Sequence, residues 1–131
     1  MGQSVKVLLD THVLLWWLEG ASKLSRRARN IIQNQETTVL VSAVSAWEIA
    51  IKSEAGKLEA APLLTDFSKE LEREGFAELP IFAHHAIRAG ILKGPHRDLF
   101  DRMLIAQAQA ESVPVISKDK LFDDYGVRRI W

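Results

Sequence analysis

Short aliphatic runs alternate with longer segments of helical periodicity along the whole chain, and this alternation restricts the fold more than any other feature. The expected strands cover residues 5–9, 39–42, 78–81, 114–117 and 128–130. The expected helices cover residues 12–19, 25–34, 44–55, 63–74, 83–91 and 100–111. Strands separated by helices are typical of βαβ units, whose right-handed crossovers place helices on both faces of a parallel sheet. We therefore predict a three-layer α/β/α fold with a mostly parallel sheet of about five strands.

The length of 131 residues suits one domain, so we expect residues 1–131 to form a single unit. The chain has no cysteine, which excludes disulfides and thiolate chemistry and favours a reducing compartment. Its longest wholly apolar run, residues 13–18, has six residues. A membrane span needs about 20 and a signal peptide needs a longer apolar run behind a basic flank. We expect a soluble, cytoplasmic protein without membrane association.

Four acidic residues stand where a parallel sheet would gather them. Asp10 and Asp119 directly follow strands, Glu48 lies inside an apolar helix, and Asp101 lies at the start of another helix. In open α/β sheets, ligands bind beyond the carboxyl ends of the strands, so these side chains should converge on one pocket. Four carboxylates repel one another unless a cation is bound among them. Oxygen ligands without cysteine or a spaced histidine pair favour Mg²⁺ or Mn²⁺ over zinc.

Two of these acids also have a purely structural interpretation. Asp10, followed by Thr11, could cap the next helix through its side chain. Glu48 could complete a capping box with Ser45, and it is correctly spaced to pair with Lys52. A carboxylate on an apolar helix face is costly, however, unless something there needs it. For Glu48 this favours a functional role.

Asp98 and Asp101 are one helical turn apart, and one of them is expected to be the helix cap. Asp101 shares a face with Leu104 and Ile105, so it should point toward the sheet. Asp98 lies outside the periodic region and is the better candidate for the cap. Arg102 could orient a carboxylate or contact phosphate, or it could be a solvated helix charge. The sequence leaves these alternatives open.

The remaining polar residues give weaker indications. Asp119 also fits a simple polar turn, and the acidic pair at 123–124 is expected to lie on the surface. His84, His85 and His96 lack the His-Glu-x-x-His spacing of a zinc site, so we assign none of them to a metal. The 17 basic and 17 acidic residues give no net charge, but without the four proposed ligands the balance is +4. A positive rim around a metal site is therefore compatible with the neutral total.

Four segments of the chain resemble the PIN-domain ribonucleases in order, spacing and flanking residues. They cover residues 8–17, 45–58, 96–106 and 117–131. The closest resemblance is to the VapC-type toxins of bacterial toxin–antitoxin pairs. This chain has Leu99 where family members typically have proline, a residue that helps to start the helix.

The resemblance implies a site, an activity and partners. The family's acidic quartet corresponds to Asp10, Glu48, Asp101 and Asp119, with Ser117 as a supporting residue. Asp10 and Asp101 would mainly hold Mg²⁺, and the other two acids would position a second cation or the attacking water. The implied function is metal-dependent endonucleolytic cleavage of RNA, inhibition by a VapB-like antitoxin, and assembly into homodimers. The number of metal ions, one or two, and the cleavage of DNA in addition to RNA are left open by the sequence.

Other functions fit the sequence less well. A receiver-type signalling domain needs an acceptor aspartate after a middle strand, and residues 79–82 contain none. A haloacid-dehalogenase-like phosphatase needs Asp-x-Asp after the first strand, where His12 occupies the third position. A catalytically silent PIN-like module that binds RNA or protein is the remaining alternative. The presence of all four acids argues against it.

The helix over residues 13–18 is apolar nearly all round, more than one core-facing stripe requires. Either it is buried on both sides, or Trp16 or Trp17 lines a groove for a second subunit or an antitoxin segment. In the second case, the arginines of the next helix would flank the groove and attract an acidic partner. These are Arg26, Arg27 and Arg29.

Overall fold

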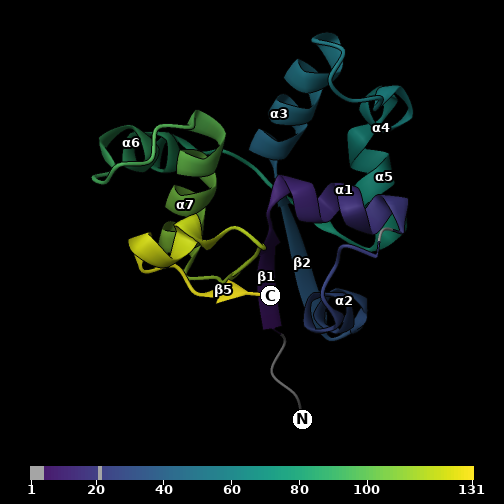
Figure 1. Cartoon of the computed structure of the whole chain (residues 1–131), viewed down its shortest axis with the longest axis horizontal. Coiled ribbons are helices and arrows are strands. Elements are labelled where there is room, and N and C mark those ends of the chain that lie inside the picture. The colour runs from purple at the N-terminus through teal and green to yellow at the C-terminus, as the bar shows by residue number, and fades with distance from the viewer. Residues whose placement is uncertain (1–4, 21) are drawn as a thin grey trace.

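A computed structural model describes residues 5–20 and 22–131, and within them five parallel strands form one sheet in the order β3-β2-β1-β4-β5. The strands are β1 (Val5–Leu9), β2 (Thr37–Ser42), β3 (Ala77–Leu79), β4 (Val115–Ile116) and β5 (Arg129–Ile130). The α-helices are α1 (Thr11–Glu19), α2 (Arg26–Gln33), α3 (Ala43–Glu54), α4 (Ala61–Thr65), α5 (Phe67–Glu74), α6 (Ala83–Ile91) and α7 (Leu99–Glu111). Figure 1 shows α6 and α7 on one side of the central strands and α1, α2, α4 and α5 on the other. The predicted three-layer α/β/α fold is confirmed.

Two local features differ from the sequence-based expectation. The helix expected over 63–74 is divided into α4 and α5, because Asp66 leaves the helical conformation and its side chain accepts a hydrogen bond from the backbone N–H of Lys69. Asp66 therefore caps α5 as a separate helix. A 3₁₀-helix, η1 (Lys120–Tyr125), also follows β4 where only a polar turn was expected.

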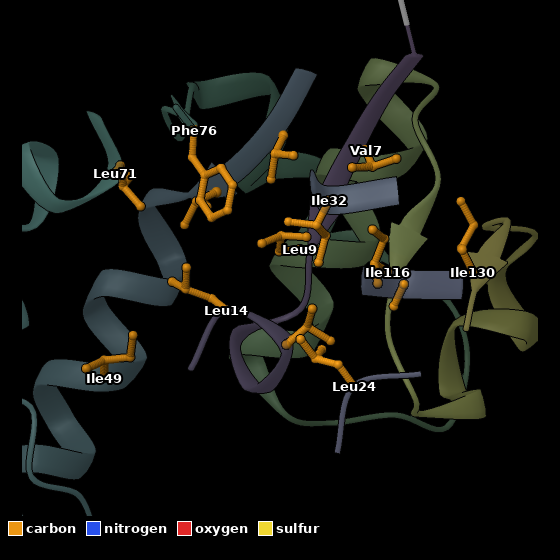
Figure 2. Close-up of a cluster of buried hydrophobic side chains, with 14 of the residues drawn as sticks. Val7, Leu9, Leu14, Leu24, Ile32, Ile49, Leu71, Phe76, Ile116 and Ile130 are labelled. Atoms are coloured by element: carbon orange, nitrogen blue, oxygen red, sulfur yellow. The ribbon is translucent and has the colours of Figure 1, made fainter. Parts of the chain in front are cut away.

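Alternate residues of β1 bury opposite faces of the sheet, as strand geometry requires. Val7 and Leu9 belong to a cluster that α1, α2, α3 and α5 cover, and Figure 2 shows this cluster around Leu9 and Phe76. Leu8 points to a second cluster, which α7 and η1 close with side chains that include Leu104 and Phe122. Both faces of β1 are buried over its last three residues, which explains why these residues are all apolar.

The strand order creates a switch point at the carboxyl ends of β1 and β4. The chain runs from β1 to β2 and β3 in one direction, and then returns to β4 on the other side of β1. The backbone N–H of Asp10 donates to the carbonyl of Ile116 at 3.1 Å, so the two strand ends stay paired up to the point where the chains diverge. A crevice at such a switch point is the usual ligand site of open α/β sheets.

Helix α1 is largely part of the core. Val13 and Leu14 are fully buried, and the four residues that follow are half-buried against the first cluster. The indole N–H of Trp17 donates to Glu74 Oε1 at 2.8 Å. The structure therefore favours burial of this helix over an exposed partner groove. Among the described residues, none of the helices combines the length and apolar character needed to cross a membrane.

Candidate active site

Asp10 and Ser117 meet at the switch point between β1 and β4. Asp10 occupies the N-cap position of α1, but its side chain makes no capping hydrogen bond. Instead the hydroxyl of the fully buried Ser117 donates to Asp10 Oδ2 at 2.6 Å. Only 8% of Asp10 is exposed. The interpretation of Asp10 as a side-chain helix cap is therefore wrong, and Ser117 supports Asp10 directly.

Asp119 is held on the other side of Ser117. The Ser117 hydroxyl oxygen accepts a hydrogen bond from the backbone N–H of Asp119 at 2.9 Å. The exposed Asp119 carboxylate accepts from the backbone N–H of Leu121 at 3.1 Å and thereby caps η1. Asp10 and Asp119 nevertheless line the same cavity. Asp119 is thus both a turn residue and a neighbour of Asp10.

Glu48 is brought to the crevice by a contact between α1 and α3. Helix α3 is capped by Ser42 rather than Ser45, so the capping box considered for Glu48 does not form. The Ser45 hydroxyl is instead hydrogen-bonded to the Thr11 hydroxyl at 2.8 Å, which ties the start of α3 to the start of α1. Glu48 lies one turn further along α3 and is 7% exposed. The expected pair with Lys52 is present, with Nζ 2.5 Å from Glu48 Oε2.

Asp98 has the capping role that its position predicts, and Asp101 makes a different contact. The Asp98 carboxylate accepts a hydrogen bond from the backbone N–H of Asp101 at 3.0 Å and caps α7. The Asp101 side chain is 26% exposed, and His96 Nε2 lies 2.7 Å from its Oδ2. His96 is a site residue that the sequence patterns left unassigned. The sequence contains one local indication of this contact, which is that His96 lies two residues before the cap Asp98. The conformation of the loop decides that the His96 ring points toward Asp101.

The electrostatics link three of the four acids. Burial raises the pKa of Asp10 more than the hydrogen bond from Ser117 lowers it, and the charge of Glu48 adds to the increase. Burial also raises the pKa of Asp101 to about 6 against the opposing hydrogen bond with His96, and the charge of Asp10 acts in the same direction as burial. These carboxylates therefore repel one another across a shared crevice.

The donor set fits a hard divalent cation. Carboxylate oxygens are the ligands that Mg²⁺ and Mn²⁺ prefer, and burial raises the pKa of both Asp10 and Asp101, so a bound cation would favour their charged forms. Asp10 shares a cavity with Asp119 and interacts by charge with Glu48 and Asp101, but in the described part of the chain the four acids do not form a tight cluster of ligand atoms. Mg²⁺ keeps several of its waters and uses one or two carboxylates directly, so spaced acids suit it.

A different group of side chains has closer ligand atoms but the wrong hydrogen bonding for a metal. His84, His85 and Glu111 have ligand atoms within 4.8 Å of one another, a spacing found in no other such group of the described residues. His85 Nδ1 accepts a hydrogen bond from the backbone N–H of Phe82 at 3.0 Å, so the ring proton is on Nε2 and points to Glu111 at 2.9 Å. That nitrogen has no free lone pair. We therefore interpret this group as a packing contact between α6 and α7.

Arg102 makes contacts that the sequence did not indicate. Its guanidinium donates to the carbonyl oxygens of Ala89 at 2.8 and 3.1 Å, Leu92 at 2.9 Å and His96 at 3.0 Å. All its donors are directed at backbone at the end of α6 and in the following loop. Arg102 is thus neither a solvated charge nor a phosphate ligand. It fixes the loop that carries His96.

Comparison with known proteins identifies the family. The sequence model of the PIN domain matches residues 7–127, almost the whole chain. The chain belongs to the PIN-domain family. No curated protein sequence matches this PIN domain.

Solved structures share the fold at low sequence identity. VapBC-1 from nontypeable Haemophilus influenzae has 13% identity and a TM-score of 0.69, over 96% of this chain and 97% of that one. VapBC2 from Rickettsia felis, bound to a DNA fragment from its promoter, has 14% identity and a TM-score of 0.68, over 96% and 98%. Mycobacterium tuberculosis VapC20, a toxin that cleaves the sarcin-ricin loop, has 14% identity and a TM-score of 0.65, over 92% and 95%.

The contacts of Arg102 predict a loss of stability on its replacement. In the PIN domain, Arg102→Met keeps the aliphatic stem but leaves the three carbonyl oxygens without their donor. Hydrogen bonds to charged groups contribute about 1.5–3 kcal/mol, so we expect the free energy of unfolding to fall by about 2 kcal/mol in urea titrations. The control is Arg88→Met, since Arg88 makes one long, exposed contact of 3.3 Å with Gln109. Equal stability of the two variants would contradict the role of Arg102.

Proposed function

We propose that this PIN domain is a Mg²⁺- or Mn²⁺-dependent endoribonuclease and the toxin of a toxin–antitoxin pair. The observation that carries the proposal is the set of carboxylates at the switch point. Asp10, Glu48 and Asp101 come from three different segments; the charge of Glu48 raises the pKa of Asp10, and the charge of Asp10 raises the pKa of Asp101. Their mutual repulsion is relieved when a divalent cation binds.

The residues that would hold the cation are Asp10 and Asp101, with Glu48 and Asp119 beside them. When bound, the cation neutralises charge on a phosphate oxygen and favours deprotonation of an attacking water. The chain holds one oxygen of each main acid in place. These contacts are Ser117 to Asp10, His96 to Asp101, and Lys52 to Glu48.

Anchoring one oxygen fixes the carboxylate plane and leaves the second oxygen to meet a cation or a water. For Glu48, Lys52 engages Oε2, so Oε1 is the atom that would orient the attacking water and accept its proton. Displacement then breaks the bond between phosphorus and the 3′ oxygen. No residue of this set needs to form a covalent intermediate, so the reaction class is direct hydrolysis of an RNA phosphodiester.

The comparisons support the proposed partners. Toxin–antitoxin proteins of the VapBC and FitAB type share this fold, and VapC20 is named as a toxin that cleaves the sarcin-ricin loop. We propose a VapB-like antitoxin, a homodimer and a cytoplasmic location for this chain as well. An apolar cavity of about 460 Å³ between α3, α6 and α7 supports a protein partner, because Trp47 and Leu99 at its edge are 52% and 67% exposed.

The test is cleavage of a labelled RNA by the purified chain without antitoxin. We expect endonucleolytic products with Mg²⁺ or Mn²⁺ and none with EDTA, and a matched single-stranded DNA shows whether the ribose is needed. Asp101→Asn is the control for a contaminating nuclease. RNA binding without cleavage at any divalent cation would indicate the catalytically silent module instead.

The cap and the ligand on α7 can be separated by mutation. Asp98→Ser keeps a side chain that can cap α7, so activity should stay within about twofold of wild type and the free energy of unfolding within a few tenths of a kcal/mol. Asp101→Asn, three residues away, should be inactive under the same metal concentration. Equal loss of activity in both variants would place Asp98 in the site.

A further inference from the structure

A cavity of about 310 Å³ adjoins the acidic crevice. Asp10 and Asp119 line it, and His12, Val13 and Trp16 contribute a mainly apolar wall. The proposed cleavage chemistry uses only the carboxylates. The wall is therefore a feature of this site that the hydrolysis itself does not explain.

The wall is aromatic and held rigidly. The His12 and Trp16 ring centroids are 5.9 Å apart with an angle of 30° between the planes. Trp16 also packs against Trp131 with a centroid distance of 5.9 Å, and it is half-buried against the core. Because Trp131 and the first hydrophobic cluster already pack against Trp16, the part of its ring that lines the cavity can receive a flat ligand without a large rearrangement.

Positive side chains lie at the edge of the same cavity. Lys118 lines it, and Lys23 Nζ lies 5.7 Å from the centre of the Trp16 ring. Both lysines are exposed. The cavity thus combines carboxylates, an aromatic surface and nearby cations. A nucleotide offers matching groups: a phosphate for a cation held by the acids, a flat base for the aromatic ring, and a further phosphate for the lysines.

We propose that this cavity binds the nucleobase of a nucleotide adjacent to the scissile phosphodiester, stacked on Trp16. The proposal rests on the proposed nuclease function, since it assigns the neighbour of the same site. Small-molecule pockets typically have volumes of about 300–1,000 Å³. The cavity volume of about 310 Å³ is near the lower end of this range and suits a single base. Stacking is tolerant of sequence, so Trp16 contributes affinity for unpaired nucleotides and selects single-stranded or looped RNA over duplex.

The first test observes the indole N–H groups of the wild-type chain by NMR during titration in the presence of Mg²⁺. The Trp16 signal is assigned as the one missing from the spectrum of Trp16→Leu. Uridine and adenosine 5′-monophosphate should shift this signal, whereas ribose 5-phosphate, which has no base, should not. The signals of Trp17 and Trp47 serve as internal controls, since Trp131 packs against Trp16 and can respond with it. No shift, or an equal shift with ribose 5-phosphate, would overturn the base subsite and leave the wall to a protein partner.

The second test uses oligoribonucleotides in which one abasic nucleotide is placed at successive positions around the cut. For wild type, the abasic nucleotide at one adjacent position should raise KM roughly tenfold, as expected for the loss of one stacked base. Trp16→Leu should raise KM equally for the intact substrate, with no further effect of the abasic nucleotide. Trp16→Phe should retain stacking, and Phe82→Leu, a change at an exposed ring preceding α6, controls for general loss of aromatic surface.

The two failures can be told apart. If the increases in KM caused by Trp16→Leu and by the abasic nucleotide multiply, the ring and the base act independently. The base subsite is then wrong, and the proposed nuclease function is unaffected. If the wild type cleaves no RNA but the Trp16 signal responds to the bases, the nuclease function fails and the subsite stands. If Trp16→Leu does not fold, Trp16→Phe provides the signal assignment, since it also lacks this indole. The wild-type titration and the KM of Trp16→Phe then test the subsite.

Discussion

Asp10→Asn is expected to slow Mg²⁺-dependent RNA cleavage by roughly a thousandfold or more while leaving the chain folded. Asparagine keeps the shape of the side chain, and the Ser117 hydroxyl can still donate to its amide oxygen. The charge that attracts the cation is lost, however. Because burial and Glu48 raise the pKa of Asp10, removing its charge should also increase the free energy of unfolding in EDTA at pH 7.

Single-turnover cleavage rates and urea titrations of the same preparation would measure both effects. The matched control is Asp124→Asn, the same substitution at an exposed position on η1, which should change neither quantity. Near wild-type cleavage by Asp10→Asn would remove Asp10 from the ligand set. Lower stability in EDTA would show that the carboxylate is needed by the fold rather than by a cation.

Without divalent cations, the stability of the protein should fall between pH 4 and pH 6. The pKa of Asp101 rises from 3.8 to about 6 on folding, mainly through burial. In this pH window the folded chain holds a proton that the unfolded chain has released, so the free energy of unfolding decreases as the pH rises. Each tenfold difference in proton affinity between the folded and unfolded chain corresponds to about 1.4 kcal/mol, so the full decrease is at most about 3 kcal/mol. The decrease levels off about one pH unit above the folded-state pKa of about 6.

Urea titrations across this window in EDTA, with wild type and Asp101→Asn, isolate the effect from that of the other carboxylates. The difference in stability between the two proteins should grow in favour of Asp101→Asn as the pH rises. Excess Mg²⁺ should restore the stability of wild type at pH 7 but not that of the variant, because a cation that binds only the folded state stabilises it. A difference that does not change with pH would show that Asp101 is not perturbed.

Features with a short sequence range could be predicted from the residues alone. The alternation of strands and helices predicted the parallel sheet. The spacing of apolar residues distinguishes a helix from a strand, because each element buries a face with its own periodicity. Asp98 could be recognised as the cap of α7 because a cap and its target N–H are three residues apart. The pair of Glu48 and Lys52 is likewise set by one helical turn. Asp10 was placed at the switch point because it ends a strand.

Contacts between distant segments were decided only by the tertiary structure. Ser117 and Asp10 are 107 positions apart, and they meet because β4 returns beside β1 after two strands have been laid down on its other side. Glu48 reaches Asp10 in a similar way, because the Ser45 hydroxyl is hydrogen-bonded to Thr11, 34 positions away, and joins the start of α3 to the start of α1. Residue type and spacing predict which groups need partners. Which groups meet depends on the direction of each crossover and on the packing of the helices over the sheet, and no local pattern of residues contains either.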